Sequence, residues 1–130
     1  MKINLIAAVG KRGQLGLDGT LPWRDPEDLD WFRSITNYGL IVVGRNTYES
    51  VAHLQGSLGR FVIVPDRGTT REDLVRTADD LNCLSVWIAG GAKVFKSFAP
   101  VVDRFYISRV DYDGPADVWM PDRTWSAPHN

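Results

Sequence analysis

The sequence predicts an α/β fold with a mainly parallel sheet. Short runs rich in apolar residues, which indicate strands, alternate with segments that carry helix-start signals, and these runs are 3–9, 40–43, 60–64, 84–89 and 105–110. Two of the runs end in glycine turns that lead directly into helices, as in strand–helix–strand units. Since the chain has 130 residues, 44% of them hydrophobic, we expect residues 1–130 to form one domain around one core.

The composition excludes several classes of protein. A net charge of −1, from 15 basic and 16 acidic residues, provides no bulk attraction for nucleic acid or an anionic membrane. Cys83 is the only cysteine, which excludes an internal disulfide, and the isolated His53 and His129 do not indicate a metal site. No apolar run approaches the ~20 residues of a membrane span. We therefore expect a cytoplasmic protein without a bound metal ion.

The first predicted strand, 3–9, is apolar throughout, as expected of a strand buried on both faces in the middle of a sheet. Segment 10–22 follows it and contains four glycines. It is too loose for a regular element and longer than an ordinary connection. This segment is either a lid over a site or an ordinary flexible loop.

The stretch 23–32 opens a helix and places an acid among apolar residues. Asp25 suits the N-cap, and Pro26 suits the first helical position. At helical spacing, Asp28 shares a face with Trp31 and Phe32. Asp28 therefore either complements the positive end of the helix dipole or is an acid in an apolar cleft, where a polar ligand would be its partner.

Both glycine turns suit the binding of anions. Gly44 and Arg45 follow strand 40–43, and Gly90-Gly91 follow strand 84–89. Backbone N–H groups at the helix starts that come next can bind phosphate, although a tight turn with a solvated arginine explains the first turn equally well. Taken together, the two turns indicate a dinucleotide site at the C-terminal ends of parallel strands.

Two further segments are expected to be scaffold. A helix that begins after Thr69 or Thr70 has acids at capping-box spacing and runs to about Leu81. Segment 111–121 is a polar loop, in which Trp119 is expected to be a packing residue.

The last predicted strand, 105–110, alternates between two faces. Phe105 and Ile107 share one face, and Tyr106 and Ser108 share the other. The second pair can therefore face a polar site.

Five ordered segments make the sequence similar to the dihydrofolate reductases. They span about residues 3 to 122 in the family's order and approximate spacing, which is far more specific than a single glycine motif. The resemblance implies the three-layer fold of that family, a mainly parallel central sheet flanked by helices. The segments are Ile6-Ala7-Ala8-Val9, Leu21-Pro22-Trp23, Asp28-Leu29-Asp30-Trp31-Phe32, Val43-Gly44-Arg45-Asn46-Thr47-Tyr48-Glu49-Ser50 and Ala89-Gly90-Gly91.

The resemblance implies an NADPH-dependent reduction of 7,8-dihydrofolate, with hydride transfer to C6 of the pterin and protonation of N5. Asp28 would bind the pterin amino group and ring N–H and would promote protonation. Ser108 would orient that carboxylate. Residues 10–23 would form a lid that excludes water, with Trp23 as a third catalytic residue.

The same resemblance assigns residues to the two ligands. Arg60 would bind the glutamate carboxylate of the substrate, and a cis peptide would join Gly90 and Gly91. The implied substrate-binding residues are Ile6, Ala7, Leu29, Phe32, Val51, Leu54, Arg60 and Ala89. The implied NADPH-binding residues are Ala8, Leu15, Gly16, Gly44, Arg45, Asn46, Thr47, Val64, Arg67, Gly90, Gly91, Ala92, Lys93, Val94 and Phe95.

Several residues depart from the family's pattern near the cofactor. Pro65-Asp66 replace a hydroxyl pair that helps to hold the 2′-phosphate, and an acid there would repel phosphate unless Arg67 compensates. Phe95 lacks the hydroxyl of the usual tyrosine, and Ala92 replaces a glycine. We therefore expect a reduced affinity for the cofactor.

The chain ends where the family adds a C-terminal pair of strands, which would leave strand 105–110 at an exposed edge. Because an unprotected edge invites pairing, we expect a homodimer or another covering element.

Two alternative functions remain open at this point. One is the related pyrimidine reductase of riboflavin synthesis, which shares the fold and the NADPH site. The other is a folate-binding structural protein with little or no catalysis.

Overall fold

The computed structural model describes residues 1–16, 23 and 26–121, apart from the side chain of Asp28. Its main feature is a five-stranded sheet in the order β4-β3-β5-β1-β6, in which all neighbouring strands are parallel. The predicted α/β class, the parallel sheet and the internal position of the first strand are confirmed. The strands are β1 (Ile3–Val9), β3 (Gly39–Val43), β4 (Phe61–Ile63), β5 (Ser85–Gly90) and β6 (Arg104–Arg109).

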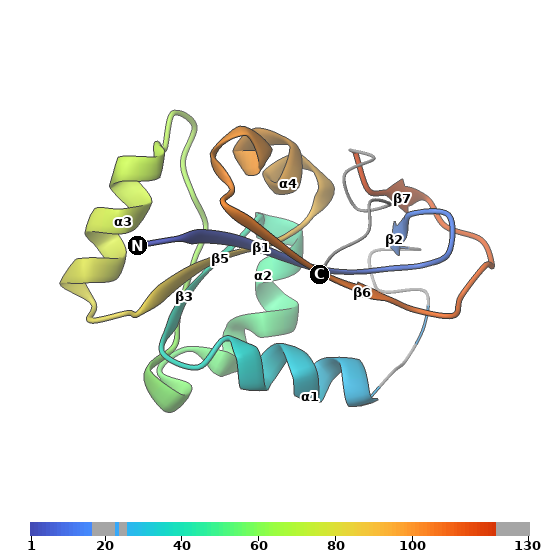
Figure 1. The fold of residues 1–130 in the computed structure, drawn as a ribbon, viewed down its shortest axis with the longest axis horizontal. Coiled ribbons are helices and arrows are strands. Elements are labelled where there is room, and N and C mark those ends of the chain that lie inside the picture. Colours follow the sequence, from blue (N-terminus) through green and yellow to red (C-terminus); the bar gives the residue numbers. More distant parts are fainter. Residues whose placement is uncertain (17–22, 24–25, 122–130) are drawn as a thin grey trace.

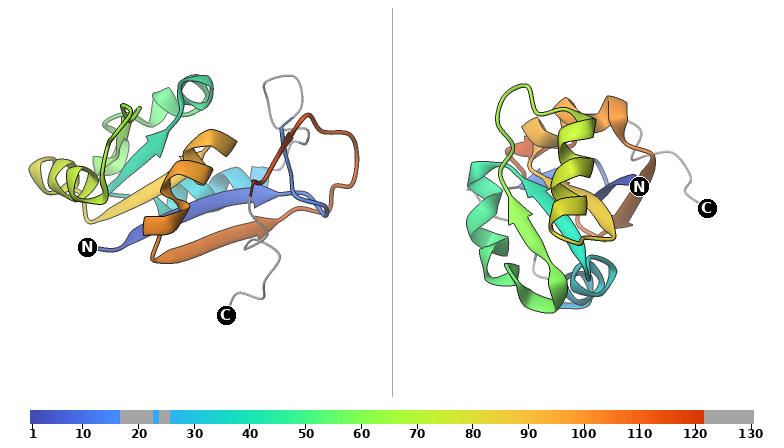
Figure 2. Two further views of the ribbon diagram at one scale, coloured as in Figure 1. Left: turned by 90° about the horizontal axis from the view of Figure 1, so that it is seen from above. Right: turned by 90° about the vertical axis from the view of Figure 1, so that its left-hand side faces the viewer.

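Helices cover both faces of this sheet and complete a three-layer arrangement (Figures 1 and 2). One face carries α1 (Pro26–Ile35) and α2 (Arg45–Val51), and the opposite face carries α3 (Arg71–Asp80) and α4 (Ala92–Phe98). Short 3₁₀ turns follow α2 and α4, at Ala52–Leu54, Ser57–Gly59 and Ala99–Val101.

Two of the helices begin where local chemistry predicts. α1 starts at Pro26, the expected first helical residue, whereas the expected N-cap, Asp25, lies outside the described residues. α3 starts after Thr70, whose hydroxyl accepts from the backbone N–H of Asp73 at 3.1 Å. The Asp73 carboxylate accepts in return from the backbone N–H of Thr70 at 2.9 Å, which completes the predicted capping box.

Alternation along the strands divides the apolar side chains into two clusters on opposite faces. The first cluster lies under α3 and α4 and consists of Ile3, Leu5, Ala7, Val9, Leu40, Val42, Leu74, Ala78, Cys83, Val86, Ile88, Val94, Phe95 and Phe98. The second cluster lies under α1 and α2 and consists of Ile41, Val43, Leu54 and Val62, with Phe32, Tyr48, Val51 and Ala89 packed against it.

A small second sheet corrects two of the sequence-based expectations. The segments 10–22 and 111–121 were both predicted to lack regular structure, but β2 (Gln14–Gly16) pairs antiparallel with β7 (Val118–Trp119). Further backbone bonds, from Asp117 N to Gly16 O and from Met120 N to Gly13 O, extend this pairing. Because each strand is very short and its partner is remote in sequence, neither segment has a periodicity that reveals the pairing.

β6 forms one edge of the described five-stranded sheet, next to β1. Phe105 and Ile107 pack against the first cluster, as the predicted alternation requires. On the other face, the Tyr106 ring meets the Trp87 ring edge-on, with 5.2 Å between the ring centroids. In the part of the chain that the structure describes, the helices are too short or too polar to cross a bilayer.

Candidate active site

The two predicted glycine turns lie side by side at the C-terminal end of the sheet. The backbone N–H of Gly44, after β3, donates to the carbonyl oxygen of Gly90, at the end of β5, over 2.7 Å. The Gly90–Gly91 peptide is cis, as the resemblance implied. Parallel strands that end together in this way form the crevice where α/β proteins bind nucleotides.

Close packing around these turns favours glycine. A Cβ atom on Gly44 would lie 3.3 Å from Cγ2 of Val94, and one on Gly91 would lie 3.4 Å from Oγ1 of Thr47. Gly90 has φ of +125°, a conformation that side chains disfavour, and its position faces the Phe95 ring. The structure therefore brings the predicted residues Thr47, Val94 and Phe95 against the two turns.

A cleft of about 910 Å³ extends from Gly44 between α4 and the segment that follows β4. Six of the predicted cofactor-binding residues line it: Gly44, Arg45, Val64, Arg67, Lys93 and Val94. Its walls carry the cations Arg45, Arg67, Arg71 and Lys93 and the acids Asp66 and Glu72. This excess of positive charge suits a ligand with several phosphates.

The remaining predicted cofactor residues lie at other positions. Asn46 and Ala92 belong to the first turns of α2 and α4. Ala8 is half-buried in β1. Leu15 and Gly16 belong to β2, where Leu15 packs against the first cluster and the Gly16 carbonyl accepts from Asp117 N.

Most of the predicted substrate-binding residues gather on the second face. Phe32, Val51, Leu54 and Ala89 all belong to or pack against the second cluster. Alternation places Ile6 and Ala8 of β1 on this face, and Ala8 is in register with Ser108 of β6. Two predicted residues differ in position: the Ala7 side chain points into the first cluster, and Leu29 is 48% exposed.

Two of the three predicted catalytic residues have described side chains. Ser108 is half-buried in β6. The Trp23 ring lies 5.5 Å from the Tyr112 ring, and its Nε1 is buried without a hydrogen-bond partner in the described part of the chain. Asp28 lies in the first turn of α1, but its side chain is outside the described part. The contact between Asp28 and Ser108 therefore stays a prediction.

Arg60 is the buried cation of the site and only 3% exposed. It lines an open cleft of about 470 Å³ together with Asp30, Arg33, Ser34, Asn37, His53, Leu54, Ser57 and Leu58. Burial, and to a lesser degree the charge of Arg33, lowers the pKa of Arg60. Among the described residues, no carboxylate forms an ion pair with Arg60, so this guanidinium can receive an anion from outside.

Neutral oxygen atoms surround the Arg60 guanidinium. Its Nε donates to Thr36 Oγ1 over 3.3 Å. Its Nη1 donates to the carbonyl oxygen and the hydroxyl of Ser57, over 3.1 and 3.3 Å. Its Nη2 donates to the Arg33 carbonyl over 2.5 Å and to Asn37 Oδ1 over 2.6 Å. The resemblance to the family identified Arg60 but not these neighbours.

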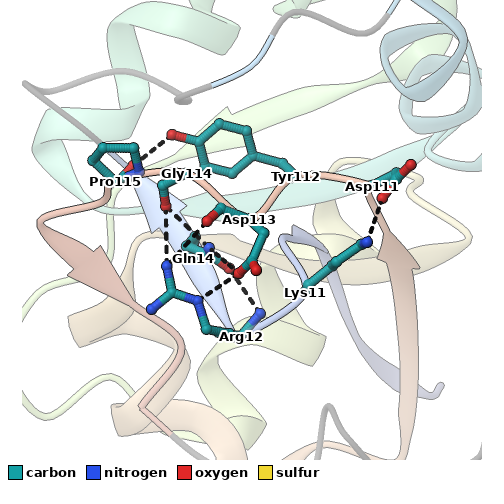
Figure 3. A network of polar contacts seen from close by, with 8 residues as sticks. All are labelled: Lys11, Arg12, Gln14, Asp111, Tyr112, Asp113, Gly114 and Pro115. Atoms are coloured by element: carbon teal, nitrogen blue, oxygen red, sulfur yellow. Dashed lines mark hydrogen bonds and ion pairs between the residues drawn. The ribbon is translucent and has the colours of Figure 1, made fainter.

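A polar network joins the turn after β1 to the segment after β6 (Figure 3). Arg12 Nε contacts Asp113 Oδ1 at 2.5 Å, and Lys11 Nζ contacts Asp111 Oδ1 at 2.9 Å. These contacts lower the pKa of Asp113 and raise the pKa of Lys11. The buried Gln14 side chain donates to the Gly114 carbonyl over 3.1 Å. The network thus holds residues 11–14, at the start of the predicted lid, against residues 111–114.

Sequence reasoning missed this network and also Tyr112. Arg12 and Asp113 are 101 positions apart, and neither belongs to a periodic segment. Arg12 also lies over the ring of Trp119 at 5.4 Å from its centroid, while Trp119 remains 40% exposed. Opposite charges in the two segments were the only available signal, and such charges are common on any protein surface.

Comparison with known proteins gives one consistent family. A family model described as dihydrofolate reductase matches residues 2–129. The dihydrofolate reductase type 15 of Escherichia coli is 32% identical over 132 residues, which cover 94% of this chain and 83% of that protein. The dihydrofolate reductase of Buchnera aphidicola subsp. Acyrthosiphon pisum is 28% identical over 129 residues, which cover 94% and 80%.

A solved structure agrees with these relatives. The dihydrofolate reductase from Enterococcus faecalis, complexed with NADP(H) and RAB-propyl, superimposes with a TM-score of 0.76 at 29% sequence identity. The superposition covers 96% of this chain and 80% of that chain.

Proposed function

This chain belongs to the dihydrofolate reductase family, and from that premise we propose that it reduces 7,8-dihydrofolate to 5,6,7,8-tetrahydrofolate with NADPH. The reaction transfers a hydride to C6 of the pterin and a proton to N5. The observation that carries the proposal is the junction of the Gly44 and Gly90 turns. This junction lies between the basic cleft and the apolar face to which Ala89 contributes.

The residues beside this junction fit NADPH. Arg45, Arg67 and Lys93 supply cations for its phosphates, and the glycine turns allow a ligand to approach the backbone closely. When bound, NADPH supplies the hydride. Asp66 lines the same cleft as Arg67, so the two side chains act on the ligand with opposite signs.

The pterin ring occupies the second face in this proposal. Phe32 and Leu29 flank the ring, while Val51 and Leu54 line the channel of the p-aminobenzoyl group. Asp28 binds the pterin amino group and promotes protonation of N5, and Ser108 orients the Asp28 carboxylate. The apolar surroundings of the second cluster strengthen such a polar contact. Trp23, held against Tyr112, closes the site from the side of the lid.

The glutamate tail of the substrate reaches Arg60. This assignment is supported by the burial of the guanidinium, by its position in an open cleft and by the absence of an acidic partner among the described residues. A carboxylate is the anion that best matches a buried arginine in geometry and charge.

Spectrophotometric turnover of dihydrofolate with NADPH tests the proposal directly. We expect turnover with dihydrofolate and none with the aminopyrimidine substrate of the riboflavin pathway. Folate binding without turnover would instead support a structural folate-binding protein, and turnover of the aminopyrimidine alone would support the pyrimidine reductase.

We also propose that the enzyme acts in the cytoplasm as a homodimer. The dimer forms through the outer edge of β6, where the described residues provide no partner strand. Light scattering over a range of concentrations measures this association. A monomer at every concentration would contradict the dimer without affecting the proposed reaction.

A further inference from the structure

We propose that the side-chain oxygens of Asn37 and Ser57 occupy N–H groups of Arg60 that a substrate carboxylate also needs. The carboxylate must displace these oxygens to bind. The inference rests on the proposed function, because it assumes that Arg60 receives the glutamate tail of a folate. On this view, two side chains beside the arginine set the affinity for the glutamate tail.

The Arg60 guanidinium has as many acceptors around it as it has donors. A guanidinium has five N–H groups, and five oxygen atoms accept from Arg60: two from Ser57 and one each from Thr36, Arg33 and Asn37. The number of acceptors therefore equals the number of donors. A carboxylate that enters the cleft must replace some of these oxygens.

Some acceptors around Arg60 are fixed, and others can move. The carbonyl oxygens of Arg33 and Ser57 belong to the backbone of α1 and of a 3₁₀ turn. The Thr36 hydroxyl donates to the Phe32 carbonyl over 2.8 Å, which fixes its lone pairs toward Arg60. By contrast, Asn37 and Ser57 are exposed residues. Their side chains can rotate into water, where other hydrogen bonds satisfy them.

A carboxylate differs in charge and geometry from the oxygens that it replaces. The present bonds each have one charged group, the guanidinium, whereas a carboxylate adds a second charge and can accept from Nη1 and Nη2 together. The exchange therefore favours the carboxylate. The lost bonds to Asn37 and Ser57 nevertheless reduce its affinity, and the shorter bond, 2.6 Å to Asn37, is expected to contribute more than the 3.3 Å bond to Ser57 Oγ.

The experiment compares dihydrofolate with the primary amide of dihydropteroate, which has neither the glutamate nor a free carboxylate. Dissociation constants are measured for the unmodified protein and for Asn37→Ala, Ser57→Ala and Asn37→Asp. We expect Asn37→Ala to tighten the binding of dihydrofolate relative to that of the amide by about fivefold, and Ser57→Ala to do so by about twofold. Asn37→Asp introduces a permanent competitor, so it should weaken dihydrofolate selectively by about tenfold.

Ser34→Ala is the matched control. Ser34 lines the same cleft, but its hydroxyl donates to the Trp31 carbonyl over 2.9 Å and not to the Arg60 site. This substitution should leave the ratio of the two dissociation constants unchanged. A similar change in the ratio for Ser34→Ala would overturn the inference, because the effect would then not depend on Arg60.

Two further outcomes overturn the proposal. If Asn37→Ala weakens dihydrofolate, then Asn37 positions Arg60 and does not compete with the ligand. If Asn37→Ala leaves the ratio unchanged, then the Asn37 bond has no role in recognition.

Turnover with NADPH tests the proposed function independently of the competition at Arg60. If neither pterin is turned over with NADPH, the reaction assigned above is wrong. The competition is then measured with p-aminobenzoylglutamate and p-aminobenzamide as probes, by titration calorimetry. A tighter complex of p-aminobenzoylglutamate with Asn37→Ala still supports the inference, and an unchanged or weaker one overturns it.

Discussion

The two faces of the central sheet differ in what they bury. The face under α3 and α4 is a closed apolar core, in which Leu74, Val86 and Ile88 are almost completely buried. The face under α1 and α2 combines a smaller apolar cluster with the buried Arg60, the half-buried Ser108 and the open cleft beside Arg60. The first face buries the larger apolar cluster and therefore contributes more to stability. The second face contributes recognition of the substrate in the proposed reaction.

Leu74→Ala tests the first face and should have the largest effect. Leu74 is 1% exposed in α3, so its truncation leaves a cavity in the first cluster. We expect the free energy of unfolding, measured by urea denaturation, to fall by about 2–5 kcal/mol. Turnover per folded molecule should not change. Leu84→Ala, at a residue that is 75% exposed, is the control and should change stability by less than about 0.5 kcal/mol.

Asp28→Asn tests the second face. The substitution preserves size and removes a group assigned to proton transfer, so we expect turnover of dihydrofolate to fall by roughly 10²-fold. The free energy of unfolding should remain close to that of the unmodified protein. Glu27→Gln, the same chemical change one position earlier in α1, controls for the lost charge. Near-normal turnover of Asp28→Asn would remove Asp28 from the mechanism.

Arg60→Ala should affect both substrate binding and stability, so it tests whether one residue of the second face contributes to both. Loss of the guanidinium should weaken the binding of dihydrofolate by about tenfold while changing that of the primary amide of dihydropteroate by less than about twofold. It also leaves the Thr36 hydroxyl and two backbone carbonyls without their donor, so stability should fall by about 1–3 kcal/mol. Ligand titration and urea denaturation on one preparation separate the two effects. Equal weakening of both pterins would contradict the assigned role.

Asp103 tests the opposite end of the sheet and should have the smallest effect. Its carboxylate accepts from the Ile3 backbone N–H over 2.8 Å, and this bond, more than the charges of Arg71 and Lys2, lowers the pKa of Asp103. A pKa that is lower in the folded protein adds stability above the ordinary value of 3.8, and that stability is lost as the pH falls.

The measurement is urea denaturation of Asp103→Asn at neutral pH and at about pH 3. We expect the variant to be less stable than the unmodified protein at neutral pH, with a smaller difference at the acidic pH. Asp79→Asn, at an exposed acid in α3, controls for net charge. A difference that does not depend on pH would show that the Asp103 carboxylate makes no such contribution.

Local patterns in the sequence determined the fold class and the elements that form the site. Alternation in the strands predicted the two faces, as Phe105 and Ile107 show, and the Thr70 capping box predicted the start of α3. The glycine turns predicted the junction at Gly44 and Gly90. Each of these features depends on residues that are close in sequence, so its signal remains in a short window. Resemblance to a family then supplied the ligands and the roles of Asp28 and Arg60.

Only the tertiary structure decided which remote segments meet. The pairing of β2 with β7, the contact of Arg12 with Asp113 and the oxygens around Arg60 join parts of the chain that share no local pattern. Asn37 illustrates the limit, because nothing in its sequence neighbours predicts a bond to an arginine 23 positions away. Such contacts depend on how the helices and turns pack over the sheet, and single polar residues at their ends follow no period.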